Sequence, residues 1–269
     1  MDNRPIGVFD SGMGGLTAVV ELQKVLPREN IVYFGDPGRV PYGTKSPEIL
    51  RKYARQDIDF LKTKNVKMIL AACGTVSSAA GEIGETCGVL YSGVLKPTAA
   101  AAIRETKNRR IGVIGTPATI RSGAYERLLK ASCPDAEIFS RACPLFVPLV
   151  ENRHTKRDDP LVKETMKEYL AGLREKEIDT LILGCTHYPL LAGAIGDFMG
   201  PGVSLINSGR EAALYCAQTL RERGLLREAG EGAAQYFVSD SVEGFRENAR
   251  ACLGAPVEGP VEWVAIDDY

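Results

Sequence analysis

Two short stretches of the chain place a cysteine where it could do acid–base chemistry. Thr180–Pro189 reads TLILGCTHYP, an apolar run that ends at Cys185, and Met68–Ser77 reads MILAACGTVS, with the same form around Cys73. A thiol has an ordinary pKa of about 8.5, so near neutral pH it can act as an acid or, once activated, as a base. Two thiols on opposite faces of one carbon could racemise it, because one would remove a proton and the other would supply one.

The residues around each cysteine indicate the elements that must position it. A short apolar run followed by small and polar residues is typical of a buried strand that leads into a helix. The positive potential at a helix N-terminus favours a thiolate. Thr75 and Thr186 are expected to cap these helices, and their backbone N–H groups could hold a substrate carboxylate.

Strands alternate with helices along the chain, which predicts an α/β protein with mostly parallel sheets. Strands are expected over residues 5–10, 31–34, 66–71, 89–95, 110–114, 137–140, 180–183, 203–206 and 235–238, the last of which closes the chain. Ligands of such sheets bind at the carboxyl ends of the strands. The residues expected at those ends are Asp10, Asp36, Cys73, Thr116, Cys185 and Ser208.

An internal repeat indicates that the two cysteines face each other. The segments that begin at Ile6 (IGVFDS) and Ile111 (IGVIGT) are similar and lie 105 residues apart, and the two cysteines lie 112 residues apart. Short apolar strands can look alike by chance, but two matches at nearly equal offsets favour a duplicated α/β half. We therefore expect two similar domains, residues 1–96 plus 207–269 and residues 97–206, related by a pseudo-twofold axis. The active site would lie in the cleft between them.

Composition and charge narrow the class of protein. The 269 residues are 45% hydrophobic and carry a net charge of −1, which argues against a nucleic-acid partner or a membrane surface. Neither a membrane-spanning run nor a signal peptide is evident, so a cytoplasmic location is expected. The seven cysteines form no CxxC pair, which argues against structural zinc. Four of them are expected simply to be buried: Cys87, Cys133, Cys216 and Cys252.

Neither a cofactor nor a metal is expected at the site. No lysine lies at a comparable strand end to anchor pyridoxal phosphate, and His154 and His187 are the only histidines. Residues 10–15 (DSGMGG) could suggest a phosphate-binding loop, but they lack the features of a P-loop and of GxGxxG. His187 could be a buried structural histidine, yet its place beside Cys185 favours a functional role. His154 lies in a charged loop and is expected to be solvated.

The chain resembles the glutamate racemases, a family within the aspartate/glutamate racemase superfamily. The resemblance covers essentially the whole chain and depends on several segments in a fixed order: IGVFDSGMGGL at residues 6–16, Asp36 with PYG at residues 41–43, Cys73 with Thr75, Gly115 with Thr116, and GCTHYP at residues 184–189. It implies cofactor-independent interconversion of L- and D-glutamate, which supplies D-glutamate for peptidoglycan. It also implies that a homodimer could form. Closure of the cleft on substrate is expected separately, because the site must shed water to stabilise a carbanion.

The resemblance also assigns residues to the site. It implies that Cys73 and Cys185 are the acid and the base, that Asp10 assists the first and His187 the second, and that Glu151 takes part. The substrate contacts that it implies are Asp10, Ser11, Tyr42, Gly43, Gly74, Thr75, Thr116, Cys185 and Thr186. On the residues alone, Glu151 borders a charged loop, and Tyr42 could merely pack beneath its turn.

Two departures from the family pattern leave other functions open. Gly74 stands where the family has an asparagine whose amide contacts the substrate, and Thr98 stands where it has a glycine. The alternatives are an aspartate racemase, a decarboxylase or isomerase that uses one cysteine, and an amino-acid-binding protein without activity. Retention of both cysteines argues against decarboxylation, which needs a proton donor on only one face.

Overall fold

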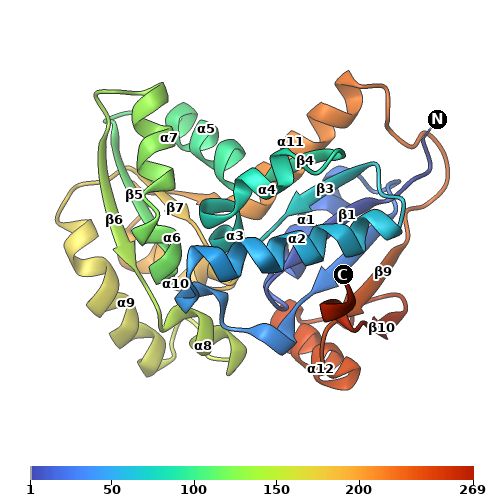
Figure 1. The fold of residues 1–269 in the computed structure, drawn as a ribbon. Helices are drawn as coiled ribbons and strands as arrows, with labels where there is room; N and C mark the ends of the chain where they lie inside the picture. Colours follow the sequence, from blue (N-terminus) through green and yellow to red (C-terminus); the bar gives the residue numbers. More distant parts are fainter. Residues whose placement is uncertain (1) are drawn as a thin grey trace.

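The protein folds around two parallel sheets that lie side by side (Figure 1). The computed structural model describes residues 2–269, except for the side chain of Cys252. The first sheet has the order β10-β9-β2-β1-β3-β4 and the second the order β6-β5-β7-β8, and each strand pair is parallel. The strands are β1 (Ile6–Asp10), β2 (Ile31–Gly35), β3 (Met68–Ala71), β4 (Leu90–Gly93), β5 (Arg110–Gly115), β6 (Glu137–Ala142), β7 (Thr180–Leu183), β8 (Ser204–Asn207), β9 (Ala234–Val238) and β10 (Val261–Trp263).

Helices connect the strands and cover the sheets. The α-helices are α1 (Leu16–Val25), α2 (Pro47–Thr63), α3 (Gly74–Ala79), α4 (Gly81–Glu85), α5 (Leu95–Glu105), α6 (Pro117–Arg121), α7 (Ala124–Ser132), α8 (Phe146–Glu151), α9 (Pro160–Arg174), α10 (Ala192–Met199), α11 (Ser208–Glu222) and α12 (Val242–Leu253). The short 3₁₀ helices are η1 (Pro37–Arg39), η2 (Tyr42–Thr44), η3 (Tyr188–Leu191) and η4 (Ile266–Asp268). Helix α2 begins as its sequence predicts, because the Ser46 side chain accepts a hydrogen bond from the N–H of Ile49 and Pro47 is the first helical residue.

The two sheets repeat one strand order, which is the structural form of the predicted repeat. The order β2-β1-β3-β4 in the first sheet matches β6-β5-β7-β8 in the second. The similar segments of the sequence are thus the equivalent strands β1 and β5, and the two cysteines follow the equivalent strands β3 and β7. The predicted α/β class with two mostly parallel sheets is confirmed.

The chain passes twice between the sheets. It leaves the first sheet after β4, enters the second at β5, and returns after β8 to form β9 and β10 (Figure 1). Helices α5 and α11 follow β4 and β8 respectively. The assignment of residues 1–96 plus 207–269 to one domain and of residues 97–206 to the other remains a proposal.

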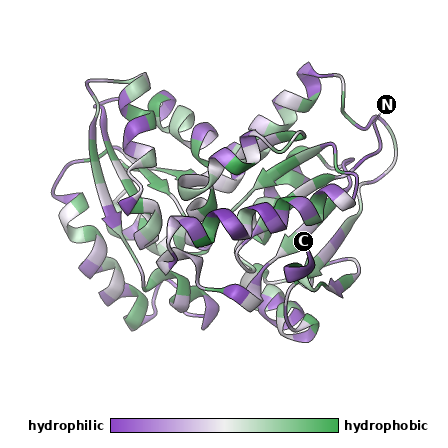
Figure 2. Ribbon diagram, in the orientation of Figure 1, coloured by the Kyte–Doolittle hydropathy of each residue, from purple (hydrophilic) through white to green (hydrophobic). Residues whose placement is uncertain are grey.

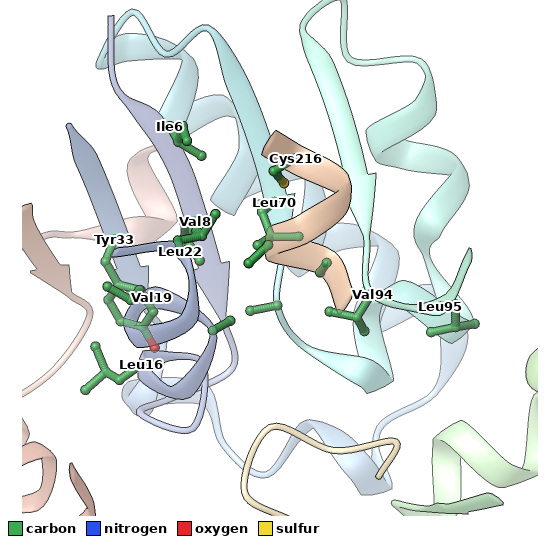
Figure 3. Close-up of a cluster of buried hydrophobic side chains, with 14 of the residues drawn as sticks. Ile6, Val8, Leu16, Val19, Leu22, Tyr33, Leu70, Val94, Leu95 and Cys216 are labelled. Atoms are coloured by element: carbon green, nitrogen blue, oxygen red, sulfur yellow. The ribbon is translucent and has the colours of Figure 1, made fainter. Parts of the chain in front are cut away.

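The central strands β1, β2 and β3 of the first sheet are buried on both faces, and their sequences are almost continuously apolar. All five residues of β1 are buried, as expected for a parallel strand covered on two sides. On one face, Leu16 and Leu22 of α1 and Cys216 of α11 pack against Ile6 and Leu70 (Figure 3). The ribbon of the first sheet's strands is coloured mostly hydrophobic, whereas the side of α2 that faces the viewer is largely hydrophilic (Figure 2). This packing fixes the strand ends from which the site is built.

Four predictions about the elements were wrong or incomplete. Residues 95–97 begin α5 instead of ending a strand, and residues 146–151, expected as a buried loop or broken helix, form α8. Helix α12 and strand β10 follow the strand that was expected to close the chain. Of the cysteines expected to be buried, Cys216 is buried, Cys87 and Cys133 are only half-buried, and the side chain of Cys252 lies outside the described part. Within residues 2–269, no helix is long and apolar enough to cross a membrane.

Candidate active site

A cavity of about 420 Å³ lies between the carboxyl ends of the strands of the two sheets. Both Cys73 and Cys185 line it, as do the predicted site residues Ser11, Tyr42, Gly43, Gly74, Thr75, Thr116, Glu151, Thr186 and His187. Asp10 is fully buried and is not part of the wall. The volume is within the usual range for small-molecule sites. The topology therefore brings the predicted residues together, with Asp10 directly behind the wall.

The first half of the site is built around Cys73, which follows β3 and is the N-cap residue of α3. Its thiol donates a long hydrogen bond of 3.7 Å to Oγ of Ser11. Burial, together with the negative charge of Asp10, raises the pKa of Cys73 to about 12. The N–H of Val76 in α3 acts to lower this pKa, as expected at a helix N-terminus, but burial outweighs that effect.

Asp10 supports the turn that carries Ser11. Its Oδ2 accepts hydrogen bonds from the N–H groups of Gly12 and Gly15, at 3.2 and 2.9 Å. Burial raises the pKa of Asp10 above its ordinary value, although the charge of His187 acts in the opposite direction. Its Oδ1 accepts a hydrogen bond of 3.5 Å from Oγ1 of Thr186. Asp10 thus orders one half of the site and contacts the other.

The second half of the site is built around Cys185, which follows β7. Its Sγ lies 3.9 Å from Nδ1 of His187, and Nε2 of that ring lies 3.2 Å from Oε1 of Glu151. The latter is an ion-pair distance, but the ring N–H is not aligned for a full hydrogen bond. Burial acts to lower the pKa of His187, yet its interactions with Cys185 and Glu151 outweigh burial and raise that pKa to about 10. Cys185 therefore has an imidazolium as its neighbour at neutral pH.

The two threonines do not cap helices as expected. Thr75 lies inside α3, and its Oγ1 is 2.9 Å from Oγ1 of Thr116. Thr186 is in the turn before η3, so a 3₁₀ helix follows Cys185 where an α-helix was expected. Both hydroxyls instead reach the opposite half of the molecule. A further bond in the same region joins Oγ1 of Thr17 to the carbonyl of Thr186 at 3.0 Å.

Tyr42 turns its hydroxyl away from the cavity. The phenol donates a hydrogen bond to Asp36 and lies 3.5 Å from Oδ2 of Asp57. Arg39 binds both carboxylates, at 2.6 and 2.9 Å. A role for Tyr42 in substrate contact would therefore use its ring or backbone. This buried network holds the turn that presents Gly43 to the cavity.

The site offers little that could hold a metal or an imine-forming cofactor. Among the residues that the structure describes, no group of three or more His, Cys, Asp or Glu side chains is arranged to bind a metal ion. The described residues that line the cavity include no lysine. His154 lies on the surface, where its Nδ1 is 2.7 Å from Oδ2 of Asp159, so its expected solvated position is confirmed.

The paired cysteine turns invite comparison with known proteins. A family model for Asp/Glu/Hydantoin racemases matches residues 17–216. The chain belongs to the Asp/Glu/hydantoin racemase family. It is therefore an enzyme of the racemase type.

Individual racemases support the finer resemblance. A glutamate racemase of Geobacter metallireducens is 45% identical over 266 residues, which cover 98% of this chain and 97% of that protein. One of Chlorobaculum tepidum is 47% identical over 253 residues, which cover 93% and 92%. The crystal structure of glutamate racemase from Francisella tularensis in complex with D-glutamate has a TM-score of 0.92 at 37% identity and covers 100% of both chains. The resemblance to glutamate racemases is thus confirmed, as is the two-domain fold.

Several residues of this racemase's cavity were not expected from the sequence. They include Pro117 at the start of α6, two residues just before α8 and two within it: Cys143, Pro144, Val147 and Pro148. Cys143 is fully buried, and burial raises its pKa above the ordinary value. The apolar stretch at residues 143–151 with its two prolines was the available signal, because small-molecule pockets are lined mostly by apolar side chains.

Proposed function

We propose that the enzyme interconverts L- and D-glutamate by moving the Cα proton between Cys73 and Cys185, without a cofactor. The observation that carries this proposal is that two thiols from equivalent strand ends open onto one cavity. The relatives named glutamate racemase support the choice of substrate. The same resemblance supports a role in supplying D-glutamate for peptidoglycan. The cytoplasmic location and the homodimer remain predictions.

The proton balance of the reaction requires one thiol and one thiolate. In one direction the Cys185 thiolate takes the Cα proton, the electron pair stays on the carbon, and the Cys73 thiol then protonates the opposite face. In the other direction the roles are exchanged. The raised pKa of Cys73, about 12, supports its role as the proton donor of the resting site. On the other side of the cavity, the raised pKa of His187 places a cationic ring 3.9 Å from Sγ of Cys185.

The walls of the cavity suit a small amino acid with two carboxylates. Hydroxyl groups of Ser11, Thr75, Thr116 and Thr186 offer hydrogen-bond donors from both halves of the molecule. The carbanion is a high-energy species, so preorganised donors that stabilise its carboxylate in a water-poor cavity lower the barrier. Binding between the halves also holds the Cα between the two thiols, which is the positioning that the reaction needs.

The test is direct. Dialysed enzyme with a chelator and no added cofactor is incubated with L-glutamate or L-aspartate, and the optical activity of each amino acid is followed. We expect the optical activity of glutamate to decay to zero while that of aspartate persists. Decay of aspartate alone would make the enzyme an aspartate racemase. Activity that appears only with added pyridoxal phosphate would contradict the cofactor-independent mechanism.

A further inference from the structure

The two cysteine turns touch through backbone at a single glycine. A Cβ atom placed on Gly74 would lie 2.3 Å from the carbonyl oxygen of Gly184 and 3.8 Å from Cα of Cys185. Real Cβ atoms essentially never approach another heavy atom closer than 3.0 Å. The backbone of Gly74 is in the ordinary helical region of α3, so its conformation does not require glycine. It is the space beside Gly184 that requires it.

Neither side of this contact is free to move away. The N–H of Gly184 donates a 2.8 Å hydrogen bond to the carbonyl of Ile114 in β5, which ties Gly184 to the second sheet. On the other side, Ser77 ties α3 to the ends of two strands of the first sheet. Its Oγ donates to the carbonyl of Ala71 at the end of β3 and accepts from the N–H of Val94, which follows β4. A side chain at position 74 could therefore be accommodated only by a shift of one half of the molecule relative to the other.

The contact lies directly beside both thiols. Cys73 immediately precedes Gly74, and Cys185 immediately follows Gly184. A second glycine on the same side, Gly14, also lies against the second half, because a Cβ there would be 2.4 Å from Oγ1 of Thr186 and 2.6 Å from the ring of His187. These neighbours are side-chain atoms, however, and can adjust more easily than the carbonyl at Gly184. Gly74 is thus the stricter of the two limits on how closely the halves approach.

We propose that Gly74 determines the separation between Cys73 and Cys185 in the closed site, by allowing its backbone to contact the carbonyl of Gly184. The proposal depends on the proposed two-cysteine reaction and adds a residue that tunes it. A Cβ at this position would need about 1 Å more room to reach an ordinary contact distance, and a misplacement of about 1 Å can reduce a rate about 100-fold. Glycine at position 74 is, in this account, a steric requirement of this chain and not merely the loss of a family side chain.

Three variants test the proposal: Gly74→Ala, Gly74→Asn and the control Gly81→Ala. Gly81 begins the neighbouring helix α4, and a Cβ there would meet no atom within 4 Å. We expect kcat for L-glutamate to fall about 100-fold in both position-74 variants, with a smaller change in KM, and to be unchanged in the control. Wild-type kcat in Gly74→Ala would overturn the proposal. So would a higher kcat in Gly74→Asn than in the wild type, because the amide contact and not the space would then govern this position.

A second measurement does not depend on activity. The alkylation of individual cysteines by iodoacetamide is followed by mass spectrometry in the same variants. Cys73 and Cys185 are 5% and 7% exposed, and fully buried Cys216 in α11 reports on the general opening of the fold. We expect faster alkylation of Cys73 and Cys185 in both position-74 variants and no change at Cys216. Equal acceleration at Cys216 would attribute the loss to a loosened fold and overturn the proposal. If the wild type did not racemise glutamate, the proposed function would fail. The alkylation rates would still show whether Gly74 sets the separation between Cys73 and Cys185.

Discussion

The two halves of the molecule share a framework but differ in the chemistry beside each thiol. Strands β1 and β3 in one sheet correspond to β5 and β7 in the other, and a cysteine follows each of the equivalent strands β3 and β7. Cys73 has the hydroxyl of Ser11 and the nearby carboxylate of Asp10 as its partners. Cys185 has the imidazolium of His187, which Glu151 supports. The repeat therefore accounts for the geometry of the site, and the residues after each strand account for its electrostatics.

This difference has a consequence for a reaction that is nearly symmetrical. The enantiomers of glutamate have equal free energies in water, so kcat/KM must be the same in both directions. The thiols nevertheless begin in different surroundings, one beside a negative group and one beside a positive group. Each thiol must therefore serve as an acid in one direction and as a base in the other, within its own surroundings.

The largest expected effect comes from removing either thiol. Because each face of the carbon needs its own proton carrier, Cys73→Ala and Cys185→Ala should each reduce the racemisation rate by about 10³- to 10⁴-fold. Cys133→Ala is the control, since Cys133 is half-buried and does not line the cavity. Polarimetry with L-glutamate gives the rates. A variant without one site cysteine that kept the parent rate would show that the two halves are not both required.

The next effect concerns the cation in the second half. His187→Gln keeps a polar side chain but removes the positive charge beside Cys185, so kcat/KM should fall about 100-fold, equally from L- and from D-glutamate. His154→Gln is the matched control, because His154 pairs with Asp159 on the surface. Steady-state kinetics from each enantiomer provides the measurement. Unchanged kinetics in His187→Gln would show that the positive charge beside Cys185 does not contribute to the reaction.

A smaller effect at neutral pH is expected for Glu151→Gln, with a distinct pH signature. The pKa of His187, about 10, lies above its ordinary value, so the imidazolium persists until the pH rises through that value. Removing the carboxylate that helps to raise the pKa should shift the alkaline loss of activity to lower pH and change the neutral rate by less than about tenfold. Glu164→Gln on the exposed side of α9 is the control. An unshifted alkaline limb in Glu151→Gln would count against the role of this pair.

The smallest effect on activity is expected from Tyr42→Phe, which alters a feature that only the first half has. The variant removes a hydroxyl that donates to the buried Asp36 and should lower stability by about 1–3 kcal/mol. The ring that lines the cavity is kept, so KM for glutamate should rise only a few-fold. Urea unfolding and steady-state kinetics measure the two effects, with Tyr53→Phe as the control. A large loss of kcat would instead place the phenol in the reaction.

The sequence predicted best those features that depend on neighbouring residues, namely the buried strands and the turns at their ends. Continuous apolar runs predicted β1, β3 and β7, because strands of a covered parallel sheet are buried on both faces. The end of β7 was predicted correctly because its apolar run stops at Gly184 and Cys185. The matching offsets of strands and cysteines predicted the repeat, and hence the shared cavity, before any contact was known.

Other features depend on contacts between distant segments, which local patterns do not contain. The direction of the Tyr42 hydroxyl is set by Asp36 and Asp57, and the protonation of Cys73 is set by burial instead of by its short helix. Helix α12 and strand β10 were missed because much of residues 239–263 is polar and exposed. The close approach of Gly74 to Gly184 joins residues from different sheets.

The most direct test of the central claim is to follow deuterium in each enantiomer at early conversion in D₂O. L-Glutamate is incubated with the enzyme, the enantiomers are separated, and the Cα deuterium content of each is measured. If Cys73 and Cys185 serve opposite faces, the newly formed D-glutamate should be fully deuterated while the remaining L-glutamate stays protiated. Extensive deuteration of the remaining L-glutamate, or D-glutamate that keeps the original proton, would indicate a single base and contradict the account.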